Sequence, residues 1–296
     1  MKFIFDQRPA PIDDPSLPDF VPFTKMEGAG NDYIYVEEFD APLKNPAPLA
    51  VKVSDRHFGV GSDGLILIGP SDKADFRMRM FNADGSEGMM CGNGVRCVAK
   101  YVYDRGLTGK SEISLETKSG IRILQVEAPN GKVDRVRVDM GAPIIVPADI
   151  PMRAPGQSFI DQAIVVEGKT WRGTAVSMGN PHLVVQVPDL DLDLPKIGPA
   201  FEFHEMFPER VNTEFIQVIS RTHVRMRVWE RGSGETMACG TGACAVLVAC
   251  ALEGLTERKA EVELRGGTLL IEWAENNTVY MTGPATEVCT GQFKVR

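Results

Sequence analysis

The sequence predicts an α/β (α+β) fold of two pseudo-symmetric domains that arose by internal duplication, each a mixed β-sheet curled around a central helix. Landmarks recur at a shift of about half the chain, which indicates a duplication. Each half also holds one segment that is apolar around most of a helical circumference, and short alternating segments surround it. A length of 296 residues suits two domains with separate cores.

Four landmarks of the first half return in the second half. Gly30 and Asn31 correspond to Gly179 and Asn180, which lie 149 residues later. The other matches lie 148 residues apart and pair residues 77–81 with 225–229, 91–94 with 239–242, and Gly106 with Gly254. Each half therefore has the same predicted order: an extended segment after a Gly-Asn turn, a charged and apolar strand, a Cys-Gly-x-Gly turn and an apolar helix.

The two apolar segments, residues 95–103 and 243–252, predict helices that are covered on all sides. Alternating patterns and turn residues predict strands around them, at residues 112–127, 133–140, 262–273 and 278–282. A shorter helix is expected around residues 197–204, inside a proline- and acid-rich connection. The predicted limits are an N-terminal extension of 1–20, a first domain of 21–140 to which 285–296 returns, and a second domain of 141–284.

Composition excludes several classes of protein. With 32 basic and 40 acidic residues, the net charge of −8 lacks the basic footprint of a nucleic-acid binder. The longest apolar run is half the length of a membrane span, and the N-terminus lacks a signal-peptide core, which favours a cytoplasmic protein. Six cysteines without a CxxC pair, and four histidines without ligand spacing, predict neither a disulfide scaffold nor a metal site.

The Cys-Gly-x-Gly turns are the candidate chemical sites. Their glycines let a ligand approach the backbone, and the helix that follows offers unpaired N–H groups to an anion. The same field favours a thiolate, so we expect Cys91 and Cys239 to have pKa values below the free value of about 8.5. Facing each other across the domain cleft, a thiolate and a thiol could invert a carbon by removing a proton on one side and adding one on the other.

Simpler interpretations exist for each residue. An isolated cysteine is most often a small buried apolar side chain, which is the expectation for Cys97, Cys244 and Cys250. Facing thiols could also form a redox pair. Asn82 could shape a turn, Glu230 and Arg231 could be a surface pair, and His182 could be a structural histidine.

Four stretches, residues 25–36, 81–101, 177–185 and 230–246, resemble the signatures of the diaminopimelate epimerase family. The resemblance extends from about Phe23 to the C-terminus. It implies a cytoplasmic enzyme without a cofactor that interconverts LL- and meso-diaminopimelate in lysine and peptidoglycan precursor synthesis. The implied binding partner of the protein is this small molecule. Neither a nucleic acid nor a membrane is implied as a partner, and a homodimer is implied.

The resemblance also assigns residues. Cys91 and Cys239 match the acid/base thiols, and His182 and Glu230 match groups that tune them. Substrate-binding positions are implied at Asn31, Gly64, Asn82, Gly92, Asn93, Asn180, Asn212, Glu230, Arg231, Gly240 and Thr241. Two positions depart from the pattern: some relatives have a substrate-contacting glutamine where Gly64 stands, and a tyrosine of the dimer contact where Cys289 stands.

Two alternatives stay open at this point. A related two-thiol racemase could act on proline, hydroxyproline or histidine, although such substrates would leave the polar groups for a distal charged end unpaired. A binding or redox protein without catalysis would use the same cleft.

Overall fold

The structure is a computed structural model that describes residue 12 and residues 17–295. The chain divides into two compact units: unit 1 holds the described residues up to Val136 and those from Ala285 onward, and unit 2 is Arg137–Pro284. Most of the predicted extension, residues 1–20, lies outside the described residues. Of its described residues, 12 and 17–20, Ile12 and Leu17 are buried in the core of unit 1.

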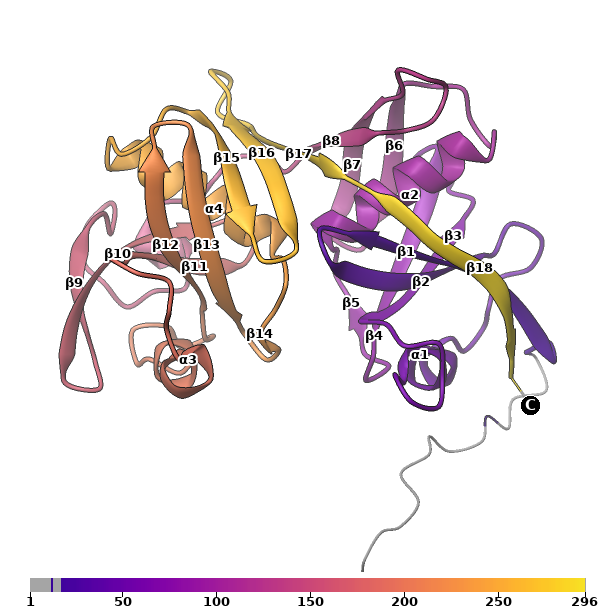
Figure 1. Cartoon of the computed structure of the whole chain (residues 1–296), viewed down its shortest axis with the longest axis horizontal. Helices are drawn as coiled ribbons and strands as arrows, with labels where there is room; N and C mark the ends of the chain where they lie inside the picture. Colours follow the sequence, from indigo (N-terminus) through magenta and orange to yellow (C-terminus); the bar gives the residue numbers. More distant parts are fainter. Residues whose placement is uncertain (1–11, 13–16, 296) are drawn as a thin grey trace, which may run out of the picture. The chain divides into compact units, whose positions relative to one another are not determined.

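Unit 1 is a mixed sheet in the order β18–β1–β2–β3–β4–β6–β7, with β5 added to β4. β2 runs parallel to β3, and β4 runs parallel to β6, whereas the other neighbours are antiparallel. Figure 1 shows the last strand, β18, lying along β1. The elements are β1 Phe20–Gly28, β2 Asn31–Glu37, α1 Ala47–Ser54, β3 Gly64–Gly69, β4 Phe76–Asn82, β5 Glu87–Gly88, α2 Gly92–Asp104, β6 Glu112–Thr117, β7 Gly120–Glu127 and β18 Thr286–Lys294.

Unit 2 repeats this plan in the order β9–β10–β11–β12–β13–β15–β16–β17–β8, with β14 added to β13. The parallel pairs stand at the same places as in unit 1. β11 runs parallel to β12, which are the second and third strands of the repeat, and β13 runs parallel to β15. The elements are β8 Arg135–Asp139, η1 Pro147–Asp149, β9 Gln162–Val166, β10 Lys169–Ser177, β11 Pro181–Gln186, α3 Leu194–Glu202, β12 Asn212–Ser220, β13 His223–Glu230, β14 Gly234–Glu235, α4 Gly240–Leu252, β15 Lys259–Leu264, β16 Gly267–Trp273 and β17 Val279–Pro284.

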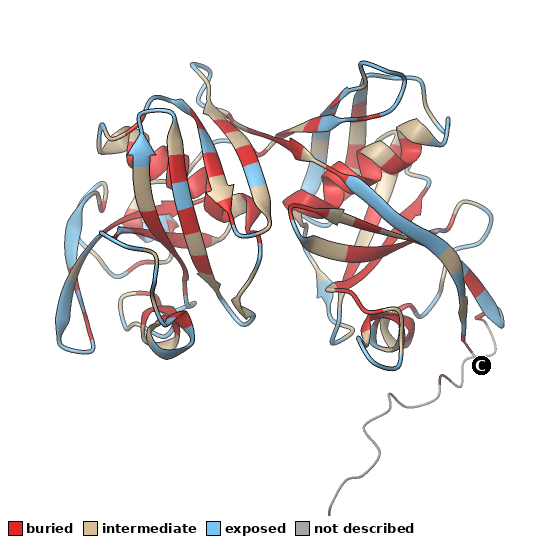
Figure 2. Cartoon of the chain, viewed as in Figure 1, coloured by how far each residue is buried: buried red, intermediate tan, exposed pale blue. Residues whose placement is uncertain are grey.

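One helix is central to each unit, and it is buried along most of its length (Figure 2). α2 contacts β1, β2 and β7, and α4 contacts β10, β11, β12, β15, β16 and β17. Both helices begin three residues before their predicted starts, because the Gly-x-Gly turns form their first turns. The predicted fold class of mixed sheets around central helices is confirmed. No helix in the described part of the chain is long and apolar enough to cross a membrane.

Other elements differ from the predicted limits. The extended run 112–127 is two antiparallel strands, because Lys118 and Ser119 turn the chain between β6 and β7. The run 262–273 is divided in the same way between β15 and β16. α3 starts three residues before the predicted helix 197–204 and ends two residues before its end, with Pro195 in its first turn, where a missing N–H is tolerated.

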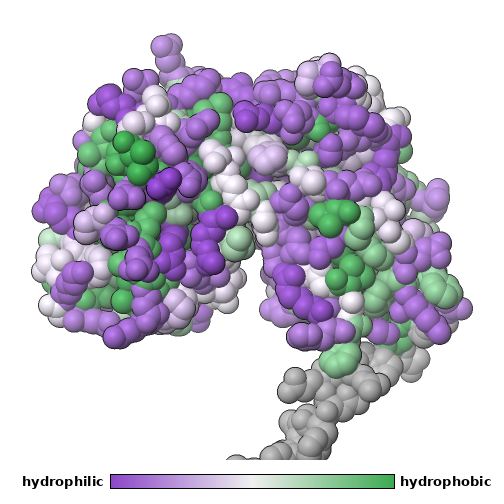
Figure 3. Space-filling view, viewed as in Figure 1, coloured by the Kyte–Doolittle hydropathy of each residue, from purple (hydrophilic) through white to green (hydrophobic). Residues whose placement is uncertain are grey.

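Each unit has its own hydrophobic core. In unit 1, Ile34, Leu65 and Leu67 of the parallel strands pack with Phe81. In unit 2, the rings of Phe201 and Phe215 meet edge to face at 5.2 Å, and Trp171 packs on Phe201 at 5.3 Å. The face in Figure 3 is mainly hydrophilic in each unit, with apolar side chains in scattered groups.

Phe201→Ala should lower the free energy of unfolding by about 3–5 kcal/mol, because it removes a fully buried ring from the aromatic cluster and leaves a cavity. Urea denaturation followed by fluorescence measures the change. Phe203→Ala, just past the same helix and 61% exposed, is the control and should cost less than about 1 kcal/mol. Equal losses in both variants would show that the aromatic cluster does not hold this core.

Candidate active site

Each predicted catalytic cysteine is the N-cap of a central helix. Cys91 has φ −128° and ψ 120°, and Cys239 has φ −126° and ψ 107°, so both residues are extended just before the helix begins. The carbonyl of Cys91 accepts the first helical hydrogen bond from Val95 at 3.0 Å. The carbonyl of Cys239 accepts the equivalent bond from Ala243 at 2.9 Å. Neither side chain forms a capping hydrogen bond to its helix.

In unit 1, Cys91 lies against the turn between β1 and β2. Its Sγ donates to Oδ1 of Asn31 at 3.2 Å, and Nδ2 of Asn93 reaches the same oxygen at 3.4 Å. Nδ2 of Asn31 donates in turn to Asp63 at 2.7 Å. The structure therefore brings together three predicted residues, Cys91, Asn31 and Asn93, and adds Asp63, which the sequence analysis missed.

Gly64 and Asn82 stand opposite each other on β3 and β4. A Cβ atom on Gly64 would lie 2.1 Å from the carbonyl oxygen of Phe81, so no larger residue is accommodated without a shift of the backbone. Asn82 donates through Nδ2 to Ser86 at 2.9 Å, so it also shapes the turn after β4.

In unit 2, Cys239 is surrounded by polar groups. Its Sγ lies 3.6 Å from the hydroxyl of Thr241, and the carboxyl of Glu230 also interacts with this thiol. Glu230 accepts a hydrogen bond from the hydroxyl of Thr236 at 2.5 Å. The predicted residues Gly240 and Thr241 form the start of α4, as Gly92 and Asn93 form the start of α2.

His182 is fully buried between two oxygen atoms. Its Nδ1 lies 2.7 Å from Oε1 of Glu214, and its Nε2 lies 3.0 Å from Oδ1 of Asn180. Glu214 is also fully buried. These two contacts hold the His182 ring in place, as expected of a structural histidine. The ring also belongs to the group of polar and charged side chains around Cys239.

The expected low pKa is wrong for Cys239. Burial raises the pKa of this thiol well above its ordinary value, and the charges of Glu230 and Glu214 raise it further. Thr241 and the backbone N–H of Gly242 act in the opposite direction and are outweighed. Burial likewise raises the pKa of Glu230. The N–H groups at the helix start therefore lower the pKa of Cys239 by less than burial and the two neighbouring carboxylates raise it.

Asn212 and Arg231 hold the loop after β13. Oδ1 of Asn212 accepts the backbone N–H of Arg231 at 2.7 Å, and its Nδ2 donates to the carbonyl of Pro181 at 3.2 Å. The Arg231 guanidinium donates to the carbonyl of Glu209 at 2.9 Å.

The remaining cysteines have the expected environments. Cys97, Cys244 and Cys250 are buried inside the two central helices, which confirms the prediction for them. Burial raises the pKa of Cys97 and that of Cys250 to about 12, so neither ionises near neutral pH.

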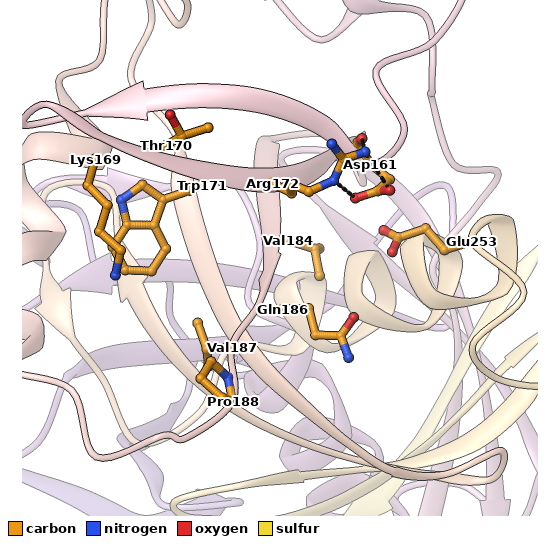
Figure 4. A pocket seen from close by; sticks show the side chains of 11 residues that line it. Asp161, Lys169, Thr170, Trp171, Arg172, Val184, Gln186, Val187, Pro188 and Glu253 are labelled. Atoms are coloured by element: carbon orange, nitrogen blue, oxygen red, sulfur yellow. Dashed lines mark hydrogen bonds and ion pairs between the residues drawn. The ribbon is translucent and has the colours of Figure 1, made fainter.

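A hollow of about 480 Å³ lies elsewhere in unit 2, on β10, β11 and the end of α4 (Figure 4). None of the predicted site residues lines this hollow. Two pairs of its lining side chains contact each other: Arg172 with Asp161 at 2.6 Å, and Lys169 over the ring of Trp171 at 3.8 Å. Among the described residues, no three His, Cys, Asp or Glu side chains are grouped to hold a metal ion.

Glu214 and Asp63 are the two site residues that sequence reasoning missed. A signal for Glu214 was present, because it interrupts an apolar strand and stands 148 residues after Ile66, its counterpart in the duplication. Asp63 follows the glycine-rich run before β3 and resembles an ordinary turn residue.

The fold, with a cysteine at the N-cap position of each central helix, places the chain in a class of duplicated α/β proteins. A PhzF-family phenazine biosynthesis protein of Bacillus anthracis has the same fold, with a TM-score of 0.65, 18% identity, and coverage of 93% of this chain and 99% of that one. A hydroxyproline epimerase of Agrobacterium vitis matches with a TM-score of 0.62, 15% identity, and coverage of 93% and 91%.

Sequence comparison identifies the family within this class. The diaminopimelate epimerase family matches residues 23–146 and 174–288. A diaminopimelate epimerase of Acetivibrio thermocellus is 58% identical over 272 residues, which are 91% of this chain and 97% of that protein. The chain belongs to the diaminopimelate epimerase family, and the resemblance seen in the sequence is confirmed.

Gly64→Ala should lower the free energy of unfolding by about 1–3 kcal/mol, because the added methyl group meets the Phe81 carbonyl. Thermal or urea unfolding measures the loss. Gly109→Ala is the matched control, since a Cβ atom there has nothing within 4 Å, and it should change stability by less than about 0.5 kcal/mol. A Gly64→Ala variant as stable as the wild type would contradict the close approach of β3 and β4.

Proposed function

We propose that the chain is an isomerase that interconverts LL- and meso-diaminopimelate by exchanging the proton on one α-carbon, without a cofactor. Membership of the diaminopimelate epimerase family supports this substrate. The observation that carries the proposal is the duplicated cysteine: Cys91 and Cys239 each precede the first turn of a buried central helix in the same extended conformation.

In this proposal the two sulfurs share the proton transfer. One is a thiolate that removes the α-proton, and the other is a thiol that donates a proton to the opposite face of the same carbon. The roles reverse when the other stereoisomer binds. Negative charge develops on the substrate carboxylate as the proton leaves, and the N–H groups at Gly92–Asn93 and Gly240–Thr241 would stabilise it at the helix starts.

The other assigned residues would hold the substrate. The amides of Asn31, Asn82, Asn180 and Asn212 provide hydrogen bonds, and Gly64 can contribute only through its backbone. Glu230 and Arg231 suit a distal amino-carboxylate end, because a guanidinium pairs with a carboxylate through two hydrogen bonds. His182 and Glu230 would tune the thiol of Cys239, as the polar contacts around this thiol support.

A racemase for a smaller amino acid is the second candidate. The hydroxyproline epimerase of A. vitis has the same fold as this chain, but a shared fold does not by itself indicate a shared substrate. A substrate without a distal charged end would leave Arg231 and its neighbours without their proposed partners. The assay below separates the two candidates.

Purified protein incubated in deuterated water with LL-diaminopimelate under reducing conditions, without pyridoxal phosphate, should form the meso isomer with one deuterium at the inverted α-carbon. Substrate recovered early in the reaction should keep its protium, because the thiolate that removes the proton is not the thiol that delivers deuterium. NMR and chiral chromatography measure both pools.

Cys91→Ala and Cys239→Ala are the controls, and each should reduce epimerisation by at least about 100-fold while the fold is retained, as circular dichroism can verify. Full activity in either variant would contradict the two-base scheme. Exchange with proline, hydroxyproline or histidine but not with diaminopimelate would favour the second candidate. No exchange with any amino acid would leave a binding or redox role.

We further propose that the chain works in the cytoplasm as a homodimer. The proposed chemistry needs two reduced thiols, which the cytoplasm maintains, and all six cysteines of the structure are thiols. For the dimer, β18 offers a strand whose residues Thr286–Thr290 are exposed, including Val288 and Cys289. An exposed strand of this kind pairs readily with a second copy.

Val288→Asp should shift the protein from dimer to monomer, because a charge on this strand opposes pairing of two copies. Light scattering after size-exclusion chromatography measures the mass. Ile219→Asp is the control and should stay dimeric, because Ile219 is exposed but lies on β12, which already pairs with a strand on each side. A wild-type protein that is monomeric at micromolar concentration would overturn the proposal.

A further inference from the structure

Glu214 is a buried carboxylate to which neither the sequence nor the family assignment above gives a role. It lies on β12, and its side chain is fully buried. Oε1 is 2.7 Å from Nδ1 of His182, and Oε2 has no hydrogen-bond partner among the described residues. A buried carboxylate with an unpartnered oxygen destabilises a fold, which makes a purely structural role a poor explanation.

The duplication supplies an internal comparison. Ile66 occupies the equivalent position in unit 1, and a Cβ atom on Gly94 of α2 would lie 2.7 Å from its Cδ1. In unit 2, a Cβ atom on Gly242 of α4 would lie 2.6 Å from Oε1 of Glu214 and 3.3 Å from Sγ of Cys239. An apolar side chain therefore fills this position well enough for packing, and only the unit of Cys239 has a carboxylate there.

Glu214 also fixes the imidazole of His182. Both ring nitrogens of His182 lie within hydrogen-bond distance of an oxygen atom, Oε1 of Glu214 and Oδ1 of Asn180. The charged partner forms the stronger hydrogen bond, so the Nδ1–H donates to Glu214 and the orientation of the ring follows.

The charges near the Cys239 thiol come from three strands and from the helix itself. His182 lies on β11, Glu214 on β12 and Glu230 at the end of β13, and α4 carries the buried thiol of Cys244. Two carboxylates thus oppose one imidazole and the N–H groups of the helix start. The unit 1 counterpart of Glu230 is the uncharged Asn82, and that of Glu214 is Ile66, so neither of these two carboxylates has an equivalent in the unit of Cys91.

We propose that Glu214 is a positioning residue that orients His182 and disfavours the thiolate of Cys239, so that Cys239 carries a proton in the resting enzyme. The proton is then ready for delivery to a substrate carbanion. This inference rests on the proposed function for its catalytic consequence, but the protonation of Cys239 is measured without any substrate.

The first experiment titrates Cys239 in the full-length wild-type protein. The rate of alkylation by iodoacetamide is measured from pH 6 to pH 11 by mass spectrometry of the peptide that contains Cys239, with N-acetylcysteine as the reference. We expect the midpoint for Cys239 to lie above that of the reference. A midpoint at or below the reference would overturn the proposal, whatever the variants do.

The second experiment removes the carboxylate in two ways. Glu214→Gln keeps the shape of the side chain, and Glu214→Ile copies Ile66 of unit 1. Each should lower the Cys239 midpoint by about one pH unit or more, because one nearby negative charge is lost. Glu38→Gln is the matched control: it removes another buried carboxylate, paired with Arg77 in unit 1, and should leave the midpoint unchanged.

Kinetics with diaminopimelate then tests the catalytic consequence. Glu214→Gln should lower kcat by about 10–100-fold with little change in KM, and should move the alkaline limb of the pH profile to lower pH. An unchanged midpoint in a folded variant would refute the role in protonation even if kcat falls. If wild-type protein exchanges no α-proton, the proposed function fails, and the thiol titration still decides the role of Glu214.

Discussion

The hydrogen bond from the fourth residue of each central helix to a cysteine carbonyl is the constraint on which the site depends. Val95 and Ala243 make these bonds to cysteines whose backbone is extended, and each sulfur lies beside the first helical turn. The bonds persist because the surrounding strands bury α2 and α4. Packing of the sheet therefore sets the position of the chemistry.

Residue patterns predicted the duplication, the fold class and both central helices, because glycine spacing and apolar periodicity are local properties of the chain. The start of each helix was predicted three residues too late, because the Gly-x-Gly turns form the first helical turns. The residue patterns did not separate β6 from β7, although Ser119 and Gly120 form a Ser-Gly turn dipeptide where the chain reverses. They also missed Glu214 and Asp63. The contacts of these carboxylates with His182 and Asn31 join residues 32 positions apart, and such pairings arise only when the sheet forms.

The two copies of the duplicated unit share a backbone plan but differ in electrostatics. Ile66 and Asn82 stand in one copy where Glu214 and Glu230 stand in the other. The general expectation that a helix start lowers a thiol pKa holds only when desolvation and neighbouring charges are weaker than the dipole. Around Cys239 they are stronger, so one scaffold supplies two thiols in unlike environments.

The return of β18 to unit 1 affects the order in which the chain can fold during synthesis. Residues 137–284 leave the ribosome as one continuous stretch, so unit 2 can complete its sheet early. β1, by contrast, waits for the last strand to be translated before its outer hydrogen bonds form. Until then the nascent polypeptide presents an open strand edge, which is the kind of surface that chaperones protect from aggregation.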